Sequence, residues 1–383
     1  MNIMLLNTWP VVDSKGGAEK VLCEMANEFV RRNHNVFIVT SNKKQGMPFY
    51  KLSKAVRFYN IYSSSKNIWA KITSVFKLTK KGRFNIRNKI IYVDPLNSIY
   101  AKEKPDIIIA YNPEALELVT QIVPYPVPVI FMLHNTPAIL FDNEKCFYRE
   151  VLEACDCVQV LIPDDIAYLE KRLNCKQIVS IPNIVPQYLE TCNYSSHKII
   201  NVGRVDKIQK RQEILIDAFA KVAQLHSDWT VEIWGDLEWD NKYTDILKQK
   251  IESYGLEDRV FLMGTTNDVV RKLMDASIFA FPSSHEGFPL ALTEAMSIGL
   301  PAVGYKSCHA VNQLIKDGVN GYLCDDSVEN FAQKLDLLMS SYGLRCQLGK
   351  QAKEDMKKYK PKTIWDKWEK LTGKIVSEYS SRL

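Results

Sequence analysis

The chain has 383 residues, of which 46% are hydrophobic and 25% are charged, and its formal net charge is +6 at pH 7. This length is enough for two domains of ordinary size, and the composition is that of a soluble globular protein. No apolar run reaches the roughly 18 residues that a helix needs to span a bilayer, so we expect no membrane-spanning helix. The nine cysteines are scattered, which favours reduced thiols over a disulfide framework or a metal site and indicates a cytoplasmic location.

The chain begins with an apolar segment that lacks the features of a signal peptide, so we expect a first strand there. Apolar strands then alternate with amphipathic helices, which indicates an α/β fold with parallel sheets. A helix is expected at residues 18–32, where Val21, Met25 and Phe29 share one face. Strands in the first half of the chain are expected at residues 3–6, 36–40, 56–61, 107–110, 129–133, 158–161 and 178–181.

Pro182, Pro186 and a polar run up to residue 197 indicate a linker between two domains. Beyond it, strands are expected at residues 198–202, 230–234, 260–263, 278–281, 302–303 and 321–323, and a last helix at residues 362–377. Doubly wound domains of this kind bind ligands at the carboxyl ends of their strands. We therefore expect an N-terminal domain of residues 1–185, a second domain of residues 186–360 and a C-terminal helix at residues 361–383.

Two segments combine charged residues with turns that open helices. The sequence G-R-V-D-K-I-Q-K places Arg204 and Lys210 at the start of one such turn. The other carries Glu286 and Glu294, separated by seven residues, where a loop of small residues opens a helix whose free N–H groups can hold an anion. Two cations suit a diphosphate and two carboxylates suit hydroxyl groups, so the pattern predicts a site for a nucleotide-sugar.

Two further positions lie where a strand ends. Gly16 and Gly17 follow the first strand, and their lack of a Cβ atom lets the backbone approach a ligand. The pattern is neither a dinucleotide-binding G-x-G-x-x-G nor a P-loop, so an ordinary tight turn is an equal alternative. His134 follows the apolar run at residues 129–133, where a packed histidine is the ordinary alternative to a functional one.

Taken together, these segments resemble the retaining glycosyltransferases of family 4, which have the GT-B fold. The resemblance rests on the G-R-x5-K and E-x7-E patterns and on three fragments in family order: K-G-G-A-E-K-V at residues 15–21, F-M-L-H-N at 131–135 and I-K-D-G-V-N-G-Y-L at 315–323. It implies two Rossmann-like doubly wound domains that face each other across a cleft. The first would bind the acceptor, the second would bind the nucleotide-sugar, and the last helix would pack back on the first.

The resemblance also implies a role for each site residue. Arg204 and Lys210 would contact the donor diphosphate and stabilise the leaving group. Glu286 would hold the donor sugar and Glu294 the ribose, while His134 would lie near the reacting centre, so that the catalytic set comprises Arg204, Lys210, Glu286 and His134. Further donor contacts would come from Gly16, Gly17, Gly287, Phe288 and Leu290.

No metal or other cofactor is expected. A D-x-D motif, which marks the other main glycosyltransferase fold, is not found in the expected place, and Arg204 and Lys210 would replace a divalent cation as the charge stabiliser. One departure from the family pattern is Arg211, where relatives often have glycine. We expect this side chain to narrow the entrance to the site.

The function that the resemblance implies is transfer of a sugar, with retention of configuration, from a nucleotide-sugar to a hydroxyl of a glycan or lipid-linked glycan in cell-surface polysaccharide biosynthesis. Uridine diphosphate is the expected donor nucleotide, and guanosine diphosphate stays open. The alternatives are a nucleotide-sugar 2-epimerase of the same fold and a non-catalytic sugar-nucleotide-binding protein. Paired carboxylates also occur in glycoside hydrolases, but these two would lie at different ends of an extended ligand.

The positive charge is concentrated in residues 29–93, which hold 15 Lys and Arg and no Asp or Glu, whereas the rest of the chain has a net charge of −9. Such a block creates a positive local potential. Residues 66–81 within it form an amphipathic pattern that could lie on an anionic membrane or pack on its own domain. No nucleic-acid-binding module is found. We therefore expect a cytoplasmic protein that can be peripheral on the inner face of the membrane.

Overall fold

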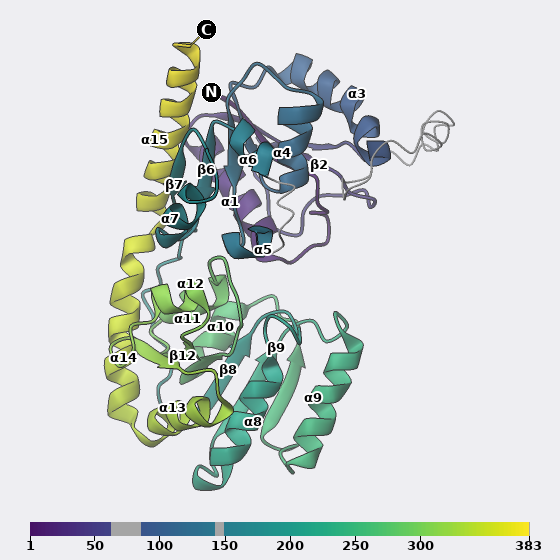
Figure 1. The fold of residues 1–383 in the computed structure, drawn as a ribbon. Helices are drawn as coiled ribbons and strands as arrows, with labels where there is room; N and C mark the ends of the chain where they lie inside the picture. Colours follow the sequence, from purple (N-terminus) through teal and green to yellow (C-terminus); the bar gives the residue numbers. More distant parts are fainter. Residues whose placement is uncertain (63–85, 142–148, 383) are drawn as a thin grey trace. The chain divides into compact units, whose positions relative to one another are not determined.

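The structure is a computed structural model that describes residues 1–62, 86–141 and 149–382 (Figure 1). It has two compact units, one made of residues 1–182 and 365–383 and the other of residues 183–364. The unit boundaries thus follow Pro182 and Ile364, whereas the sequence pattern placed the divisions after residues 185 and 360. The amphipathic pattern at residues 66–81 lies outside the described residues.

The first unit is built on a parallel sheet of seven strands in the order β3-β2-β1-β4-β5-β6-β7. In the centre of the sheet, Ile3 of β1 lies opposite Val36 of β2 on one side and Ile107 of β4 on the other. The strands are β1 (Asn2–Asn7), β2 (Asn35–Thr40), β3 (Arg57–Asn60), β4 (Ile107–Ala110), β5 (Val129–Met132), β6 (Cys157–Val160) and β7 (Ile178–Ser180).

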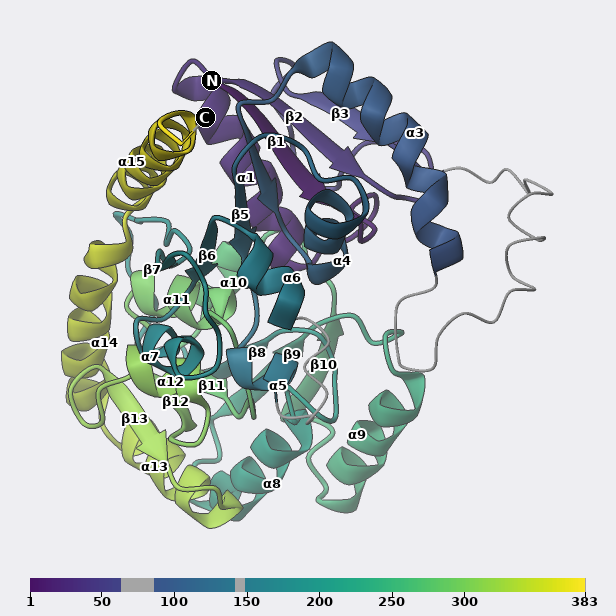
Figure 2. The same cartoon turned by 45° about the horizontal axis from the view of Figure 1, so that its top comes forward.

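Helices cover this sheet because its central strands are apolar on both faces, as is usual for parallel sheets (Figure 2). On one face, Leu96, Ala115 and Leu152 from three different helices share a buried cluster with Met4 and Ile108 of the sheet. The described helical segments are α1 (Gly17–Arg31), α3 (Ile86–Glu103), α4 (Pro113–Glu117), η1 (Leu118–Ile122), α5 (Pro137–Phe141), α6 (Arg149–Ala154) and α7 (Asp164–Glu170).

The second unit repeats the design with a parallel sheet of six strands in the order β10-β9-β8-β11-β12-β13. Its strands are β8 (Lys198–Val202), β9 (Thr230–Trp234), β10 (Val260–Gly264), β11 (Ile278–Phe281), β12 (Ala302–Tyr305) and β13 (Gly321–Cys324). The helical segments are α8 (Gln212–Val222), η2 (Ala223–Leu225), α9 (Asn241–Ser253), α10 (Val269–Met274), α11 (Leu290–Ser297), α12 (His309–Leu314), α13 (Val328–Ser340), α14 (Tyr342–Met356) and η3 (Lys357–Tyr359).

The secondary structure expected from the sequence is confirmed in both units. Every strand expected from the apolar runs is present, with ends that agree to within two residues, and the helix expected at residues 18–32 is α1. Runs that are buried on both faces and bounded by turns carry a strong strand signal when helical patterns separate them.

The last helix, α15 (Pro361–Ser380), begins in the second unit and continues into the first. Within the first unit, Asp366 accepts a hydrogen bond from Arg32 at 2.8 Å, and Glu369 lies 2.8 Å from the ring nitrogen Nε2 of His34. Its apolar face is buried through Trp368 and other side chains. In the described part of the chain, α15 and the other helices lack the combination of length and apolarity needed to cross a bilayer.

Glycines bring together the carboxyl ends of three strands in the second unit. The N–H of Gly203 donates to the carbonyl of Trp234 at 3.0 Å, and the N–H of Gly235 donates to the carbonyl of Gly264 at 2.9 Å. A Cβ atom at Gly235 would lie 2.0 Å from the carbonyl oxygen of Gly203. The chain can therefore make this close approach only with glycine at position 235, and the approach fixes where the turn after β8 begins.

Gly235→Ala should destabilise the second unit, because its methyl group would meet backbone that cannot move aside. We expect a loss of about 1–3 kcal/mol in the free energy of unfolding, the usual range for overpacking. Gly343→Ala in α14 is the matched control, because a Cβ atom there has no neighbour within 4 Å. Calorimetry of thermal unfolding measures both, and equal transition temperatures for the two variants would contradict the expectation.

Candidate functional site

The turn between β8 and α8 is organised by one aspartate. The carboxylate Oδ1 of Asp206 accepts the N–H groups of Ile208 at 2.9 Å and Gln209 at 2.7 Å. Its backbone carbonyl accepts the N–H groups of Lys210 at 3.1 Å and Arg211 at 2.9 Å. Aspartate favours such local hydrogen bonds, which replace those of a helix or strand. The turn therefore has a defined shape before any ligand is considered.

Arg204 is held on this turn and is still accessible to solvent. Its Nη2 donates to the side-chain oxygen of Gln209 at 2.8 Å, and its Nε lies 3.4 Å from a carboxylate oxygen of Asp206. Its guanidinium lies 4.8 Å from the centre of the Trp239 ring, which comes from the turn after β9. The side chain remains 41% exposed, so the guanidinium is both oriented and able to meet an anion.

Lys210 and Glu286 form a buried ion pair. The Nζ of Lys210 lies 2.5 Å from Oε1 of Glu286, and both side chains are largely covered. The lysine stem passes beside Gly203, where a Cβ atom would lie 3.4 Å from the lysine Cε, and the ammonium lies 4.9 Å from the centre of the Phe281 ring. Opposite charges attract strongly in such a poorly solvated place. The two sequence motifs are thereby joined at one point.

Backbone hydrogen bonds add to this junction. The N–H of Ser284 donates to the carbonyl of Gln209 at 2.8 Å, and the side-chain amide of Gln209 donates to the carbonyl of His285 at 3.1 Å. The hydroxyl of Ser284 donates to the carbonyl of Ile208 at 2.9 Å. The loops after β8 and β11, which are neighbouring strands, therefore behave as one structural element.

The remaining expected donor contacts of the second unit follow along the same loop. Gly287 is buried, and Phe288 is buried with its ring edge-on to Tyr359 at 5.3 Å. Leu290, which is half-buried, is the first residue of α11. Glu294 lies further along α11 and is 8% exposed. The structure thus gathers Arg204, Lys210, Glu286, Gly287, Phe288, Leu290 and Glu294 at and beyond the carboxyl edge of one sheet.

Gly16 and Gly17 lie in the first unit, where Gly16 precedes α1 and Gly17 is its first residue. The carboxylate of Glu19 folds back over Gly16, so that a Cβ atom there would lie 2.2 Å from a carboxylate oxygen. An acidic side chain is favoured at the first turn of a helix by the exposed N–H groups. Room for Glu19 is therefore one physical reason for glycine at position 16.

His134 lies just beyond β5 in the first unit and stacks on Tyr111, with ring centres 5.1 Å apart. Its Nε2 is buried and has no hydrogen-bond partner among the residues that the structure describes. Burial lowers the pKa of the imidazole from 6.5 to about 4, because the charged form loses hydration. The ring is therefore neutral near pH 7, which suits a hydrogen-bonding role and not that of a proton donor.

A thiol near the ion pair is unreactive. Cys308 precedes α12 and is fully buried. Burial, together with the nearby negative charge of Glu286, raises the pKa of this thiol to about 12. A thiol in this state is neither a nucleophile nor a metal ligand at neutral pH. Among the described residues, no three His, Cys, Asp or Glu side chains are grouped so that they could hold a metal ion.

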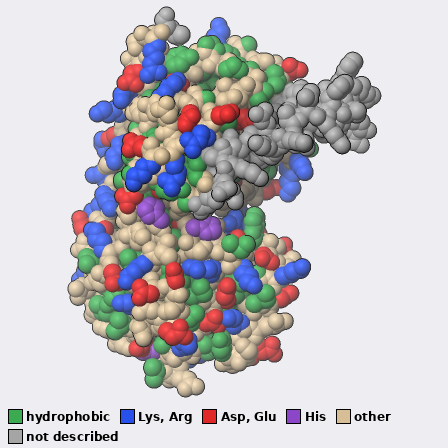
Figure 3. Space-filling view, in the orientation of Figure 1, with side chains coloured by type: hydrophobic (Ala, Val, Ile, Leu, Met, Phe, Trp, Pro, Cys, Tyr) green, Lys and Arg blue, Asp and Glu red, His purple; other side chains and the backbone are tan. Residues whose placement is uncertain are grey.

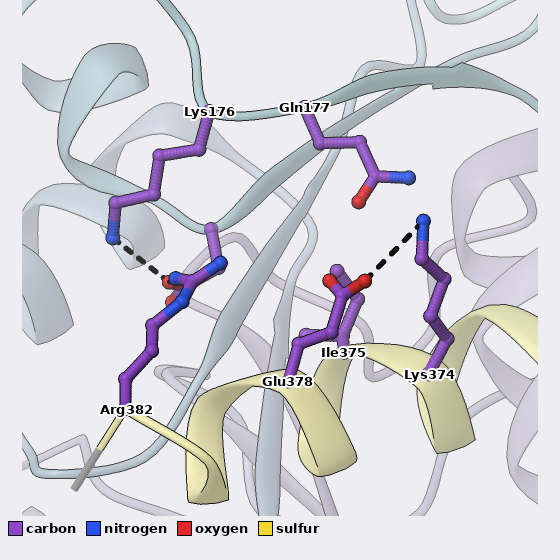
Figure 4. A pocket seen from close by; sticks show the side chains of 7 residues that line it. Lys176, Gln177, Lys374, Ile375, Glu378 and Arg382 are labelled. Carbon is purple, nitrogen blue, oxygen red and sulfur yellow. Dashed lines mark hydrogen bonds and ion pairs between the residues drawn. The ribbon is translucent and has the colours of Figure 1, made fainter.

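The surface hollow drawn in Figure 4 belongs to the first unit and is lined by none of the expected site residues. It measures about 370 Å³ and is bounded by α15 and by Asp156 and Gln177, which precede β6 and β7 at the opposite edge of the first sheet. Lys176 donates to Asp156 at 2.8 Å and Lys374 lies 3.6 Å from Glu378. Its charges are paired with one another, so we do not assign it a ligand.

Sequence patterns did not identify the residues that hold the motifs in place. Asp206 and Gln209 lie inside the G-R-x5-K pattern at positions that the pattern leaves open, and Gly235 and Trp239 belong to another strand's turn. For Asp206, the tendency of aspartate to form local turns was an available signal. For Gln209, Gly235 and Trp239, the contacts depend on the tertiary fold.

The neutral state of His134 is directly measurable. In a pH titration followed by NMR, we expect its Cε1–H resonance to shift with a midpoint near pH 4. Because the unfolded chain takes up this proton near pH 6.5, stability due to the neutral buried ring is present above that pH and is lost as the pH falls towards 4. His134→Gln assigns the resonance, and a midpoint above 6 would contradict the burial argument.

Comparisons with known proteins bear on both units. A family model described as Glycosyltransferase Family 4 matches residues 15–187, and one described as Glycosyl transferases group 1 matches residues 193–355. The amylovoran biosynthesis glycosyltransferase AmsD of Erwinia amylovora is 24% identical over 371 residues, which cover 93% of this chain and 96% of that protein.

Solved structures show the fold. A sucrose-phosphate synthase from Thermosynechococcus elongatus superposes with a TM-score of 0.81 at 17% identity, covering 98% of this chain and 99% of that one. A variant of S. aureus TarM, in complex with fondaparinux, α-GlcNAc-glycerol and UDP, superposes with a TM-score of 0.78 at 18% identity, covering 97% and 100%. With both units matched by family models and two Rossmann-like parallel sheets, the chain belongs to the group 1, family 4 glycosyltransferases and has the GT-B fold.

Proposed function

We propose that this glycosyltransferase moves a sugar from a UDP-sugar to a hydroxyl of a glycan or lipid-linked glycan, with retention of configuration and without a metal ion, in cell-surface polysaccharide biosynthesis. The observation that carries the proposal is the junction of Arg204, Lys210 and Glu286 at the ends of β8 and β11. It combines oriented cations with a carboxylate, which is the set that a diphosphate bonded to a sugar requires.

In this proposal, Arg204 and Lys210 bind the diphosphate. The negative charge on the leaving phosphate grows as the glycosidic bond breaks, so fixed cations stabilise the transition state more than the bound donor. Lys210 is held in place by Glu286 before the donor arrives. The cations would do here what a divalent ion does in metal-dependent transferases.

The carboxylates bind hydroxyl groups. Glu286 lies beside Lys210 and would accept hydrogen bonds from the donor sugar, while Glu294 on α11 would accept those of the ribose. Gly287, Phe288 and Leu290, between them, would offer backbone N–H groups to the sugar and phosphates. The neutral His134 would hydrogen-bond near the reacting centre, and the leaving phosphate would take the acceptor proton.

Two comparisons support the finer parts of the proposal. The S. aureus TarM structure contains UDP, which supports a uridine nucleotide, and the E. amylovora relative is named as a glycosyltransferase of amylovoran biosynthesis, which supports transfer in a biosynthetic pathway. The alternatives remain a nucleotide-sugar 2-epimerase of this fold and a sugar-nucleotide-binding protein without turnover. An epimerase would convert the donor with no acceptor present, and a binding protein would leave it unchanged.

Lys210→Ala should lower kcat at least about a hundredfold, as removal of a transition-state charge contact does in other enzymes. Lys207→Ala is the matched control, because Lys207 lies on the same turn and is exposed. We expect wild-type protein to bind UDP equally with and without a chelator in isothermal titration. Activity retained by Lys210→Ala, or UDP binding that requires a metal, would contradict the proposal.

We also propose that the first unit meets an anionic membrane at the cytoplasmic face. The basic stretch at residues 29–93 is less unbalanced in the fold than in the sequence, because Arg31, Arg32 and Arg57 form ion pairs with acids outside it: Glu28, Glu103 and Asp366. On the face drawn in Figure 3, basic and acidic side chains intermingle. The stretch alone therefore does not define the membrane surface.

Exposed apolar side chains on two adjoining loops support this contact better. Trp9, Met47 and Phe49 are 45%, 57% and 46% exposed. The loops adjoin because Val12 pairs with Pro48, and the Nζ of Lys15 lies 4.9 Å from the centre of the Phe49 ring. Aromatic side chains next to lysines suit the boundary between anionic headgroups and acyl chains.

Vesicle sedimentation tests this contact. We expect wild-type protein to bind phosphatidylglycerol vesicles more than phosphatidylcholine vesicles, and Trp9→Ser with Phe49→Ser to weaken binding at least about tenfold, since two apolar side chains are lost. Leu225→Ser with Leu337→Ser is the control, because both are exposed on the second unit. Equal binding to both lipids, or unchanged binding by the Trp9 and Phe49 variant, would contradict the proposal.

A further inference from the structure

Arg211 has a backbone conformation that glycine adopts more readily. It precedes α8 with φ 50° and ψ 47°, in the left-handed region where a Cβ atom is unfavourable. Its side chain makes no hydrogen bond that caps the helix. Left-handed residues other than glycine persist where the surroundings hold them, and often lie at functional sites. The surroundings of Arg211 therefore have to hold this backbone conformation, and its side chain can make contacts that glycine could not.

The Arg211 side chain makes contacts with residues outside its own turn. Its Nε donates to the carbonyl of Pro282 at 2.9 Å, and its guanidinium lies 5.0 Å from the centre of the Tyr305 ring. Pro282 is the first residue after β11, and Tyr305 is the last residue of β12. The side chain thus crosses from the start of α8 to the ends of two strands of the same sheet.

The bond to Pro282 fixes the start of the loop that carries Glu286. Three residues lie between the two along the chain, and this part of the loop is also held by Gln209, whose carbonyl accepts the N–H of Ser284 and whose side-chain amide donates to the carbonyl of His285. Both attachments come from the turn that carries Lys210, the partner of Glu286. Without the Arg211 attachment, the loop would be held only from Ser284 onwards, so the carboxylate of Glu286 would be fixed less closely against the ammonium of Lys210.

We propose that Arg211 is a positioning residue of the donor site, which holds the Pro282 carbonyl and so fixes Glu286 against Lys210. This inference rests on the proposed function, in which Glu286 contacts the donor sugar. Arg211 itself need not touch the donor. Its effect on sugar transfer should pass through Glu286, while UDP, which lacks the sugar, should be bound almost as before.

Arg211→Gly is the informative substitution, because glycine accepts the left-handed backbone and removes only the side-chain contacts. The matched control is Arg259→Gly. Arg259 precedes β10 at the opposite edge of the sheet and makes contacts of the same kind, since its Nε donates to the carbonyl of Trp229 at 2.8 Å and its guanidinium lies 5.0 Å from the Phe219 ring centre. Like Arg211, it is a half-buried arginine that connects segments of the second unit, but it does not contact the site residues.

The variants are compared by kcat per UDP-binding site, with the number of sites counted by isothermal titration. We expect Arg211→Gly to lower this kcat at least tenfold and to change the Kd for UDP less than threefold, and Arg259→Gly to change neither once sites are counted. In a Glu286→Gln background, Arg211→Gly should lower kcat little further, because the carboxylate through which Arg211 acts is already absent. An undiminished effect in that background would overturn the proposal.

Hydrogen exchange separates failure of this inference from failure of the proposed function. If the wild-type protein transfers no sugar from any UDP-sugar, the proposed function is wrong, but the attachment can still be tested. We expect the backbone amides of residues 283–287 to exchange at least tenfold faster in Arg211→Gly than in wild-type protein, and to be unchanged in Arg259→Gly. Unchanged exchange at residues 283–287 in Arg211→Gly would overturn the positioning role.

Discussion

The ion pair of Lys210 and Glu286 is the contact on which the candidate site depends. It joins loops that are 76 residues apart in the chain but follow neighbouring parallel strands. Burying two charges costs hydration that their attraction only partly restores, so such a pair is a weak source of stability. Its value is that it sets the relative position of two loops. Because the pair carries no net charge, the site can hold its cation in place without a ligand.

The residues around the ion pair stabilise the same junction of loops, some by leaving room and others by direct hydrogen bonds. Gly203 leaves room for the lysine stem, and Gly235 allows the turns after β8 and β9 to touch. Gln209 and Ser284 connect the two loops directly. In the proposed reaction, a diphosphate would meet the cations and the sugar hydroxyls would meet the carboxylate, so the donor would bring complementary groups to a pair of loops that is already ordered. Such preorganisation reduces the rearrangement needed in the transition state.

Charge along the sequence and charge in the fold are different quantities. Residues 29–93 contain no acid, yet Arg32 meets Asp366 from the last helix and Arg57 meets Glu103. A count along the chain cannot detect a partner that lies hundreds of residues away. Gly16 is a local case: sequence reasoning considered only a ligand or a tight turn, and the fold shows that the carboxylate of Glu19, three residues further on, folds back over it.

The sequence by itself determined the strands, their parallel arrangement and the motif residues, because apolar runs and helix-opening turns are local signals that depend on near neighbours. The ends of β4 and β11, for example, follow directly from the runs Ile107–Ala110 and Ile278–Phe281. Only the tertiary structure decided that Lys210 pairs with Glu286, that Arg211 reaches Pro282 and that His134 is buried and neutral. These properties depend on which strand ends become neighbours in the sheet, and that is set by the packing of the whole unit.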